Sequence, residues 1–215
     1  MVASMSSALR MPPLPMTREQ FLDWAERQEG TLWEFDGVRP VRRHGPEAMT
    51  GGRLNHAQIA VNIVITLHHR LRGGPCRAFN SDAGVGLPGG GVRYPDASVT
   101  CTRSPSMDRL LTGVLVVFEV LSPNSGRTDR ILKVRDYHTV PTIRRYVIAE
   151  STTAAVTVLE RDNPEEAWRS TPLTRDETLR MPEIGIEVPV AEFYEGVDLP
   201  DDEDSYPPLN PVATT

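Results

Sequence analysis

The sequence predicts a mixed α/β fold in which helices flank a central mixed β-sheet. Three features support this prediction: a strongly periodic helical segment at 56–71, an almost continuously apolar segment at 113–121, and several β-like runs placed between helical ones. The resulting order of helix, β, β, β, helix, β is typical of a mixed α/β layer.

Two local signals predict the first elements of the chain. Thr17 and Gln20 have the spacing of a capping box and predict a short helix at 16–27. An Asp36-Gly37 turn between two β-like runs predicts a hairpin at 32–41.

Longer patterns predict the remaining elements. Apolar residues recur every four positions in 56–71, which indicates a long helix. The β-branched run at 113–121 is typical of a strand covered on both faces. After a break at 122–126, Thr128 or Asp129 can cap a helix that runs through His138. Other strands are predicted at 77–87, 92–101, 144–149 and 155–161, with further short ones in 168–194.

The composition describes a globular protein without a membrane span. The chain has 215 residues, of which 39% are hydrophobic and 24% charged, and no apolar run reaches membrane-spanning length. The N-terminal sequence lacks the features of a signal peptide, so we expect a cytoplasmic protein. In that reducing compartment we expect Cys76 and Cys101 to be free thiols.

The two ends of the chain differ in composition from its body. Residues 1–15 are rich in Ser, Met and Pro, and residues 199–215 are acidic and rich in Pro, so we expect disordered tails around one domain at 16–198. The net charge of −6 becomes −2 without the last fifteen residues, which hold four acids and no base. A nearly neutral body argues against a non-specific coat on nucleic acid and leaves a local binding site open.

One carboxylate stands inside the predicted central strand. Glu119 lies within VVFEVL, where an unpaired buried charge is costly, so it either pairs with an arginine or belongs to a site. Asp96, which follows Pro95 in the preceding strand, is either a strand-entry residue or a second site acid. If the two acids converge, a divalent cation must relieve their repulsion. Hard oxygen ligands select Mg²⁺, with Mn²⁺ as a substitute.

The chain has a single lysine among its 23 basic residues. Lys133 falls on the helix predicted after the central strand, on the same stripe as Asp129 and Tyr137. A lysine can do chemistry that an arginine cannot, because its pKa can fall far enough to orient or deprotonate a water. The alternative is an exposed Asp129–Lys133 pair on the helix surface.

Together these motifs resemble a known family. The segments YPDASVTC, FEVLSPNSGRTDRILKVRDY and RRYVIAE, with WEFDGV, NHAQIAVNI and FNSDAGVGL upstream and LRMPEIGIEVP downstream, are similar to the Uma-type family of bacterial restriction endonucleases. This family is a branch of the PD-(D/E)xK nuclease superfamily, and the resemblance covers about residues 16–195. It implies a restriction-endonuclease-like core. The superfamily's lysine two positions after the glutamate is replaced by Leu121, and the family takes its lysine from the following helix, here Lys133.

The resemblance implies a role for each central residue. Asp96 and Glu119 would hold Mg²⁺ together with the backbone carbonyl of Val120, and Lys133 would position and help deprotonate the attacking water. Glu34, in WEFDG, would reach the metal or its waters; the alternative is a hairpin residue that faces solvent.

Three further residues are candidates for contact with substrate or for support of the metal ligands. His56 would contact a phosphate or an outer water, or would be a satisfied histidine at a helix start. The other two candidates are Asp82, which is predicted in a strand, and Tyr137, which lies on the same helix stripe as Lys133. Several arginines are candidates for a phosphate-facing patch or for ordinary solvated surface: those at 39, 42, 43, 70 and 72.

The function that follows is a Mg²⁺-dependent endonuclease that cleaves DNA, with a homodimer as a further expectation. The alternative is a catalytically silent module on the same fold that binds nucleic acid or a protein. A glycoside hydrolase is disfavoured, because such sites need no lysine and aromatic residues make up only 6% of the chain.

Overall fold

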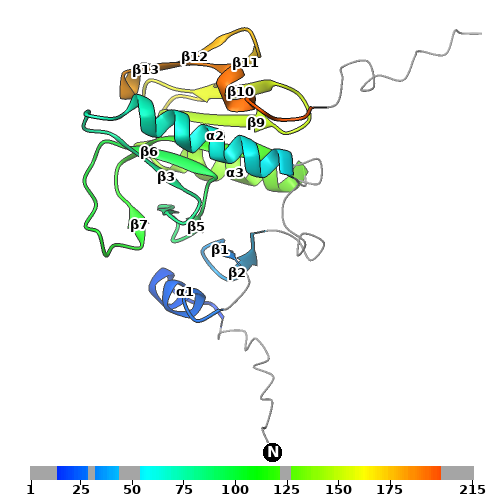
Figure 1. Ribbon diagram of the computed structural model, residues 1–215. Coiled ribbons are helices and arrows are strands. Elements are labelled where there is room, and N and C mark those ends of the chain that lie inside the picture. Colours follow the sequence, from blue (N-terminus) through cyan, green and yellow to red (C-terminus); the bar gives the residue numbers. More distant parts are fainter. Residues whose placement is uncertain (1–13, 29–31, 44–53, 122–126, 200–215) are drawn as a thin grey trace, which may run out of the picture.

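The computed structural model describes residues 14–28, 32–43, 54–121 and 127–199 (Figure 1). The predicted tails at 1–15 and 199–215 lie almost wholly outside these ranges. Among the described residues, no helix combines the length and apolar composition that a membrane crossing needs.

A six-stranded mixed sheet forms the centre of the molecule, as the sequence predicts. Its strand order is β11-β10-β9-β8-β6-β3, and β8 and β9 are parallel while the other pairs are antiparallel. The apolar run becomes the long inner strand β8, which is mostly buried because neighbouring strands and helices enclose it. The strands are β3 (Arg77–Asn80), β6 (Ala97–Thr100), β8 (Val114–Leu121), β9 (Arg145–Glu150), β10 (Ala155–Glu160) and β11 (Arg169–Thr174).

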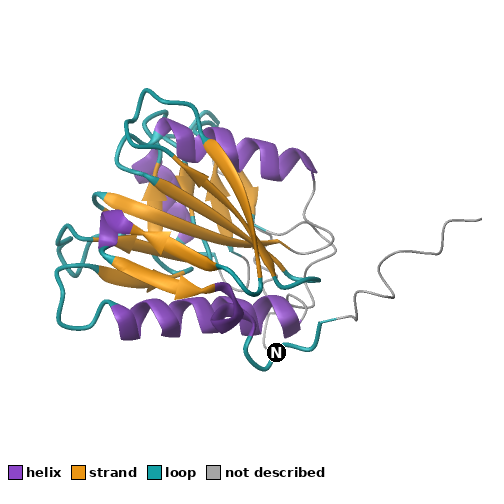
Figure 2. Ribbon diagram, turned by 90° about the horizontal axis from the view of Figure 1, so that it is seen from above, coloured by secondary structure: helices purple, strands orange, loops and turns teal. Residues whose placement is uncertain are grey.

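Helices cover both faces of this sheet (Figure 2). Helix α2 (Leu54–Arg70) buries Ile59, Ile63 and Leu67 in the core on one face. Helix α3 (Arg127–Thr139) packs Tyr137 and its neighbours into the core on the other face. Helix α3 begins at Arg127, so Thr128 and Asp129, the predicted cap positions, both fall within it.

A smaller five-stranded sheet and helix α1 (Arg18–Ala25) form the N-terminal side, which lies lowest in Figure 1. The predicted capping box of Thr17 and Gln20 is present, and Phe21 of the helix stacks on Phe35 of the sheet. The strand order is β2-β1-β5-β4-β7, with β1 (Trp33–Phe35), β2 (Pro40–Arg42), β4 (Gly84–Gly86), β5 (Val92–Arg93) and β7 (Leu110–Leu111).

The runs at 77–87 and 92–101 are each divided between the two sheets, which corrects the prediction of two unbroken strands. Strands β3 and β6 join the large sheet, and β4 and β5 join the small one. A turn closed by the hydrogen bond from the Ala83 amide to the Asn80 carbonyl separates β3 from β4. Pro95 interrupts the second run, because its nitrogen cannot donate to a ladder.

The C-terminal part forms a hairpin that completes the core on the α2 face. Strands β12 (Thr178–Met181) and β13 (Ile186–Pro189) pair across the short helix η2 (Pro182–Ile184), and η3 (Val190–Tyr194) packs against α2. The short strands expected in this region are confirmed.

The two cysteines form a disulfide, so the prediction of free thiols is wrong. Cys76 and Cys101 directly extend the antiparallel register in which Arg77 pairs with Thr100. Cys76 directly precedes β3 and Cys101 directly follows β6, so the two lie opposite each other, a proximity that the spacing of 25 residues in the sequence does not reveal.

Candidate active site

The two acids singled out in the sequence meet where β6 begins. The β6–β8 register ends at the pair Ala97 and Phe118, so the next pair along the strands would be Asp96 and Glu119. The Val120 amide donates a hydrogen bond of 2.8 Å to Asp96 Oδ2, which fixes this carboxylate against β8. Asp96 is 8% exposed and Glu119 5% exposed, so both carboxylates are buried.

Helix α3 directs two donors at Glu119. Lys133 Nζ lies 3.0 Å from Glu119 Oε2, and the Tyr137 hydroxyl donates to Oε1 at 2.8 Å. The two side chains reach the same carboxylate because residues four apart lie on one helix face. The Lys133 side chain is 13% exposed, so the ammonium belongs to the site rather than to the helix surface.

The environment shifts the pKa values of the two acids in opposite directions. Burial is the main cause that raises the pKa of Glu119 to about 7; Lys133 opposes this shift, and the charges of Asp96 and Glu34 add to it. Burial also acts to raise the pKa of Asp96, but its hydrogen bond to His56, the Val120 amide and Arg43 outweigh that effect and lower it. The phenol of Tyr137 stays protonated, because burial and the charge of Glu119 raise its pKa well above the ordinary value.

Two basic side chains, those of His56 and Arg43, contact the carboxylate of Asp96. His56 Nε2, in the first turn of α2, is 3.5 Å from Asp96 Oδ2, and the hydrogen bond to Asp96 is the main cause that raises the pKa of the imidazole. Arg43 Nη2 is 3.3 Å from Asp96 Oδ1, and its Nη1 donates to the Ser81 carbonyl at 3.2 Å. Arg43, predicted only as one member of a basic patch, points inward, and its side chain is 6% exposed.

Glu34 joins the site through electrostatics and not through contact with Glu119. Its side chain is 3% exposed, which excludes the solvent-facing alternative. Arg93 Nη1 donates to Glu34 Oε2 at 2.7 Å, and the Tyr94 amide donates to Oε1 at 3.3 Å. Arg93 Nε also donates to Asp136 Oδ2 at 3.0 Å, so one guanidinium ties β1 to α3.

Sequence reasoning missed Arg93. A signal was present, because an arginine directly before YPD falls in a predicted strand and its charge must be paired if it is buried. Arg93 is 5% exposed in the structure. Its partners lie 59 and 43 residues away, so the sequence alone does not identify them.

Other predicted residues do not come to the site. Asp82 lies in the exposed turn between β3 and β4, not in a strand, and accepts a hydrogen bond from Asn80 at 3.1 Å. Arg39 pairs with Asp36, Arg70 pairs with Glu192, and Arg42 lies over the ring of Trp33. The arginines at 39, 42, 43 and 70 therefore have separate partners.

The donor set at Asp96 and Glu119 fits a hard divalent cation. Mg²⁺ is commonly held by one or two carboxylates, with water completing its octahedron. The N–H and C=O of one strand residue point to the same side, so the Val120 carbonyl faces the side on which its amide meets Asp96. In the described part of the chain, no group of three or more His, Cys, Asp or Glu side chains is arranged for a metal.

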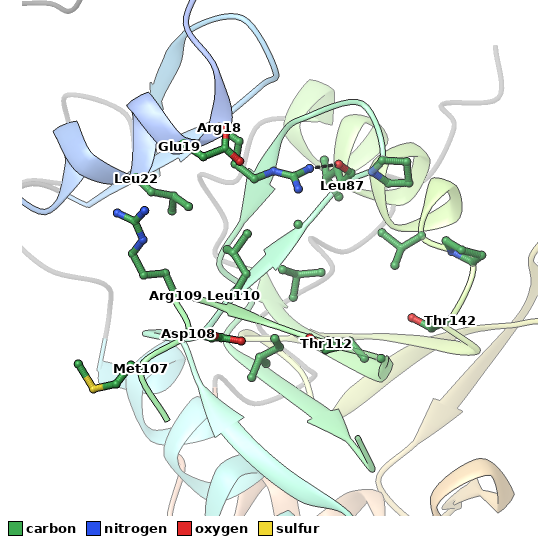
Figure 3. Close-up of a pocket in the computed structure, with 18 residues that line it drawn as sticks. Arg18, Glu19, Leu22, Leu87, Met107, Asp108, Arg109, Leu110, Thr112 and Thr142 are labelled. Atoms are coloured by element: carbon green, nitrogen blue, oxygen red, sulfur yellow. Dashed lines mark hydrogen bonds between the residues drawn. The ribbon is translucent and has the colours of Figure 1, made fainter. Parts of the chain in front are cut away.

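A pocket of about 700 Å³ lies elsewhere, between α1, β4, β7 and the turn after α3 (Figure 3). Arg18 reaches across it from α1 to the Leu87 carbonyl. None of the three residues Asp96, Glu119 and Lys133 lines this pocket. The cluster of Asp96, Glu119 and Lys133 is therefore distinct from this pocket.

Comparisons with known proteins agree with the fold. The sequence model of the Uma2 family, described as "Putative restriction endonuclease", matches residues 18–191. An uncharacterized protein of Synechocystis sp. is 30% identical over 188 residues, which cover 86% of this chain and 95% of the relative. The crystal structure of "a putative nuclease belonging to DUF820" from Anabaena variabilis superposes with a TM-score of 0.64 at 15% identity, over 84% of this chain and 98% of that one. At that identity, the likeness demonstrates a shared fold.

Proposed function

The chain belongs to the Uma2 family, and from this membership and the geometry of the site we propose that it is a metal-dependent endonuclease that hydrolyses phosphodiester bonds of DNA. The observation that carries the proposal is the convergence on Glu119. Lys133 and Tyr137 donate to its two oxygens beside the buried carboxylate of Asp96.

Asp96 and Glu119 would hold Mg²⁺, or Mn²⁺ in its place, with the Val120 carbonyl as a further ligand. When bound, the ion supplies positive charge that stabilises the developing negative charge on the phosphoryl and leaving oxygens. The pKa values support this assignment: Asp96 stays ionised, and Glu119 needs a positive charge in addition to Lys133 to ionise fully at neutral pH.

Lys133 would hold the attacking water. Its ammonium has three donor hydrogens, so it can bond Glu119 and a water together. In the hydrolysis the water loses a proton to solvent while the Lys133 ammonium stabilises the resulting hydroxide. The hydroxide oxygen forms a bond to phosphorus, the bond from phosphorus to the leaving oxygen breaks, and the leaving oxygen takes up a proton from solvent. Tyr137 donates to the second oxygen of Glu119 and thereby fixes which way that carboxylate faces.

Basic residues around Asp96 would meet the substrate. His56 and Arg43 both lie within 3.5 Å of its carboxylate, and both can donate to a phosphate oxygen. Glu34 would act through its charge, because its oxygens are engaged by Arg93 and the Tyr94 amide.

A cleavage assay tests the proposal. Supercoiled plasmid is incubated with the protein in Mg²⁺, in Mn²⁺ and in EDTA, and nicked and linear products are measured. We expect cleavage only with a divalent ion, and a loss of about 100-fold or more in Asp96→Asn, Glu119→Gln and Lys133→Met. Glu187→Gln, which changes an acid 62% exposed on β13, is the matched control and should cleave normally.

Two outcomes would overturn the proposal. Full activity in all three site variants would mean that the cleavage comes from elsewhere. Retardation of DNA without any metal-dependent product would instead identify a binding module on a nuclease fold.

A further inference from the structure

One face of α3 becomes steadily more exposed toward its N-terminal end. Tyr137 is fully buried, the Lys133 side chain is 13% exposed, and the Arg130 side chain is 42% exposed. These residues share one stripe, since they are spaced three and four apart on a helix. The site therefore opens to solvent at the N-terminal end of α3, and Arg130 lies at its rim.

Arg130 also lies over the end of the central strands. Its Nη1 is 3.9 Å from Glu150 Oε1, and Glu150 pairs with Leu121, two residues beyond Glu119 on β8. The separation is too long for a hydrogen bond, and Glu150 is 31% exposed. An ion pair of this kind contributes little and is readily exchanged for another anion.

We propose that Arg130 binds a backbone phosphate next to the one that is cleaved, an inference that rests on the proposed endonuclease function. Arg130 is three residues from Lys133, about 4.5 Å along the helix axis. Residues at this spacing are neighbours on a helix surface, so a strand whose cleaved phosphate lies at Lys133 can bring an adjacent phosphate to Arg130. A guanidinium can hold a phosphate through two parallel hydrogen bonds, with Glu150 displaced.

Separate substitutions of Arg130 and Glu150 test whether Arg130 contacts the substrate or only pairs with Glu150. If Arg130 contacts the substrate, Arg130→Gln should raise KM about five- to tenfold with little change in kcat. Glu150→Gln should lower KM, because it removes the competing anion. If the two residues only stabilise each other, both variants should change KM in the same direction or not at all.

A binding measurement removes the dependence on turnover. The affinity for a fluorescein-labelled duplex is measured by anisotropy in Ca²⁺ at several salt concentrations. Arg130→Gln should reduce the slope of log Kd against log salt by about one, and Arg130→Lys should restore most of it. Arg135→Gln, on the same helix and 72% exposed on another side, is the charge-matched control and should keep the parent slope.

The outcomes separate this inference from the proposed function. Parent-like KM and salt slope in Arg130→Gln, in a protein that cleaves DNA with Mg²⁺, would overturn the role of Arg130 alone. Absence of metal-dependent cleavage in the parent protein would overturn the endonuclease, and the anisotropy series would still decide whether Arg130 contacts phosphate.

Discussion

Glu119 should make the metal-free protein lose stability as the pH rises from 5 to about 7, and Glu119→Gln should remove this effect. Burial raises the pKa of this carboxyl from 4.5 to about 7. A group whose pKa is raised on folding contributes stability that is fully present below the unfolded value and is lost as the pH rises through the folded value. For Glu119 that window runs from about pH 4.5 to pH 7.

The size of the effect follows from the shift. Between pH 5 and pH 8, linkage with pKa values of 4.5 and about 7 lowers the free energy of unfolding by about 2.5 kcal/mol. Glutamine has a similar shape and no charge to desolvate. The stability of Glu119→Gln relative to the parent should therefore rise by about 2.5 kcal/mol over this pH range.

Urea unfolding in EDTA, followed by tryptophan fluorescence at pH 5, 6, 7 and 8, measures this difference. Glu187→Gln, which is 62% exposed, should show no such pH dependence relative to the parent. If the stability difference between Glu119→Gln and the parent stays constant from pH 5 to pH 8, the pKa of Glu119 is not raised on folding and the prediction is wrong.

Three other perturbations test the framework around the site. Arg161→Met should lower the free energy of unfolding, measured in urea, by about 3–5 kcal/mol. The buried guanidinium donates to four backbone carbonyls around the C-terminal end of α3: those of His138, Val140, Ile143 and Pro164. A loss below about 1 kcal/mol would contradict that role. Arg93→Met should cost a similar amount and reduce cleavage, since it removes the buried cation that Glu34 and Asp136 share beside the site. Parent stability with parent activity would refute this prediction. Leu67→Ala should lower the free energy of unfolding by about 2–5 kcal/mol, and the folded variant should keep the parent kcat, because Leu67 only packs α2 onto the sheet. A loss of kcat at parent stability would contradict this prediction.

The core of the site was predictable because its signals are local. Glu119 is conspicuous within an apolar strand, and the four-residue step from Lys133 to Tyr137 places both on one helix face. The helix that follows a strand usually packs back onto its sheet, so the ammonium could be expected near the carboxylate. The family match over residues 18–191 confirms the resemblance inferred from these motifs.

The missed features depend on residues that are far apart in the sequence. Arg43 pairs with Asp96 across 53 residues, and Arg93 pairs with Glu34 across 59. A long arginine side chain can point into the protein or into solvent, and only the position of its partner decides which. The division of two β runs between two sheets likewise depends on which strands lie beside them.

The most direct test of the account is an anomalous difference map from crystals soaked in Mn²⁺. The account predicts a peak between the carboxylates of Asp96 and Glu119, within water-bridging distance of Lys133 Nζ, and its loss in Glu119→Gln. A fully occupied peak at another position, or none at saturating Mn²⁺, would contradict it.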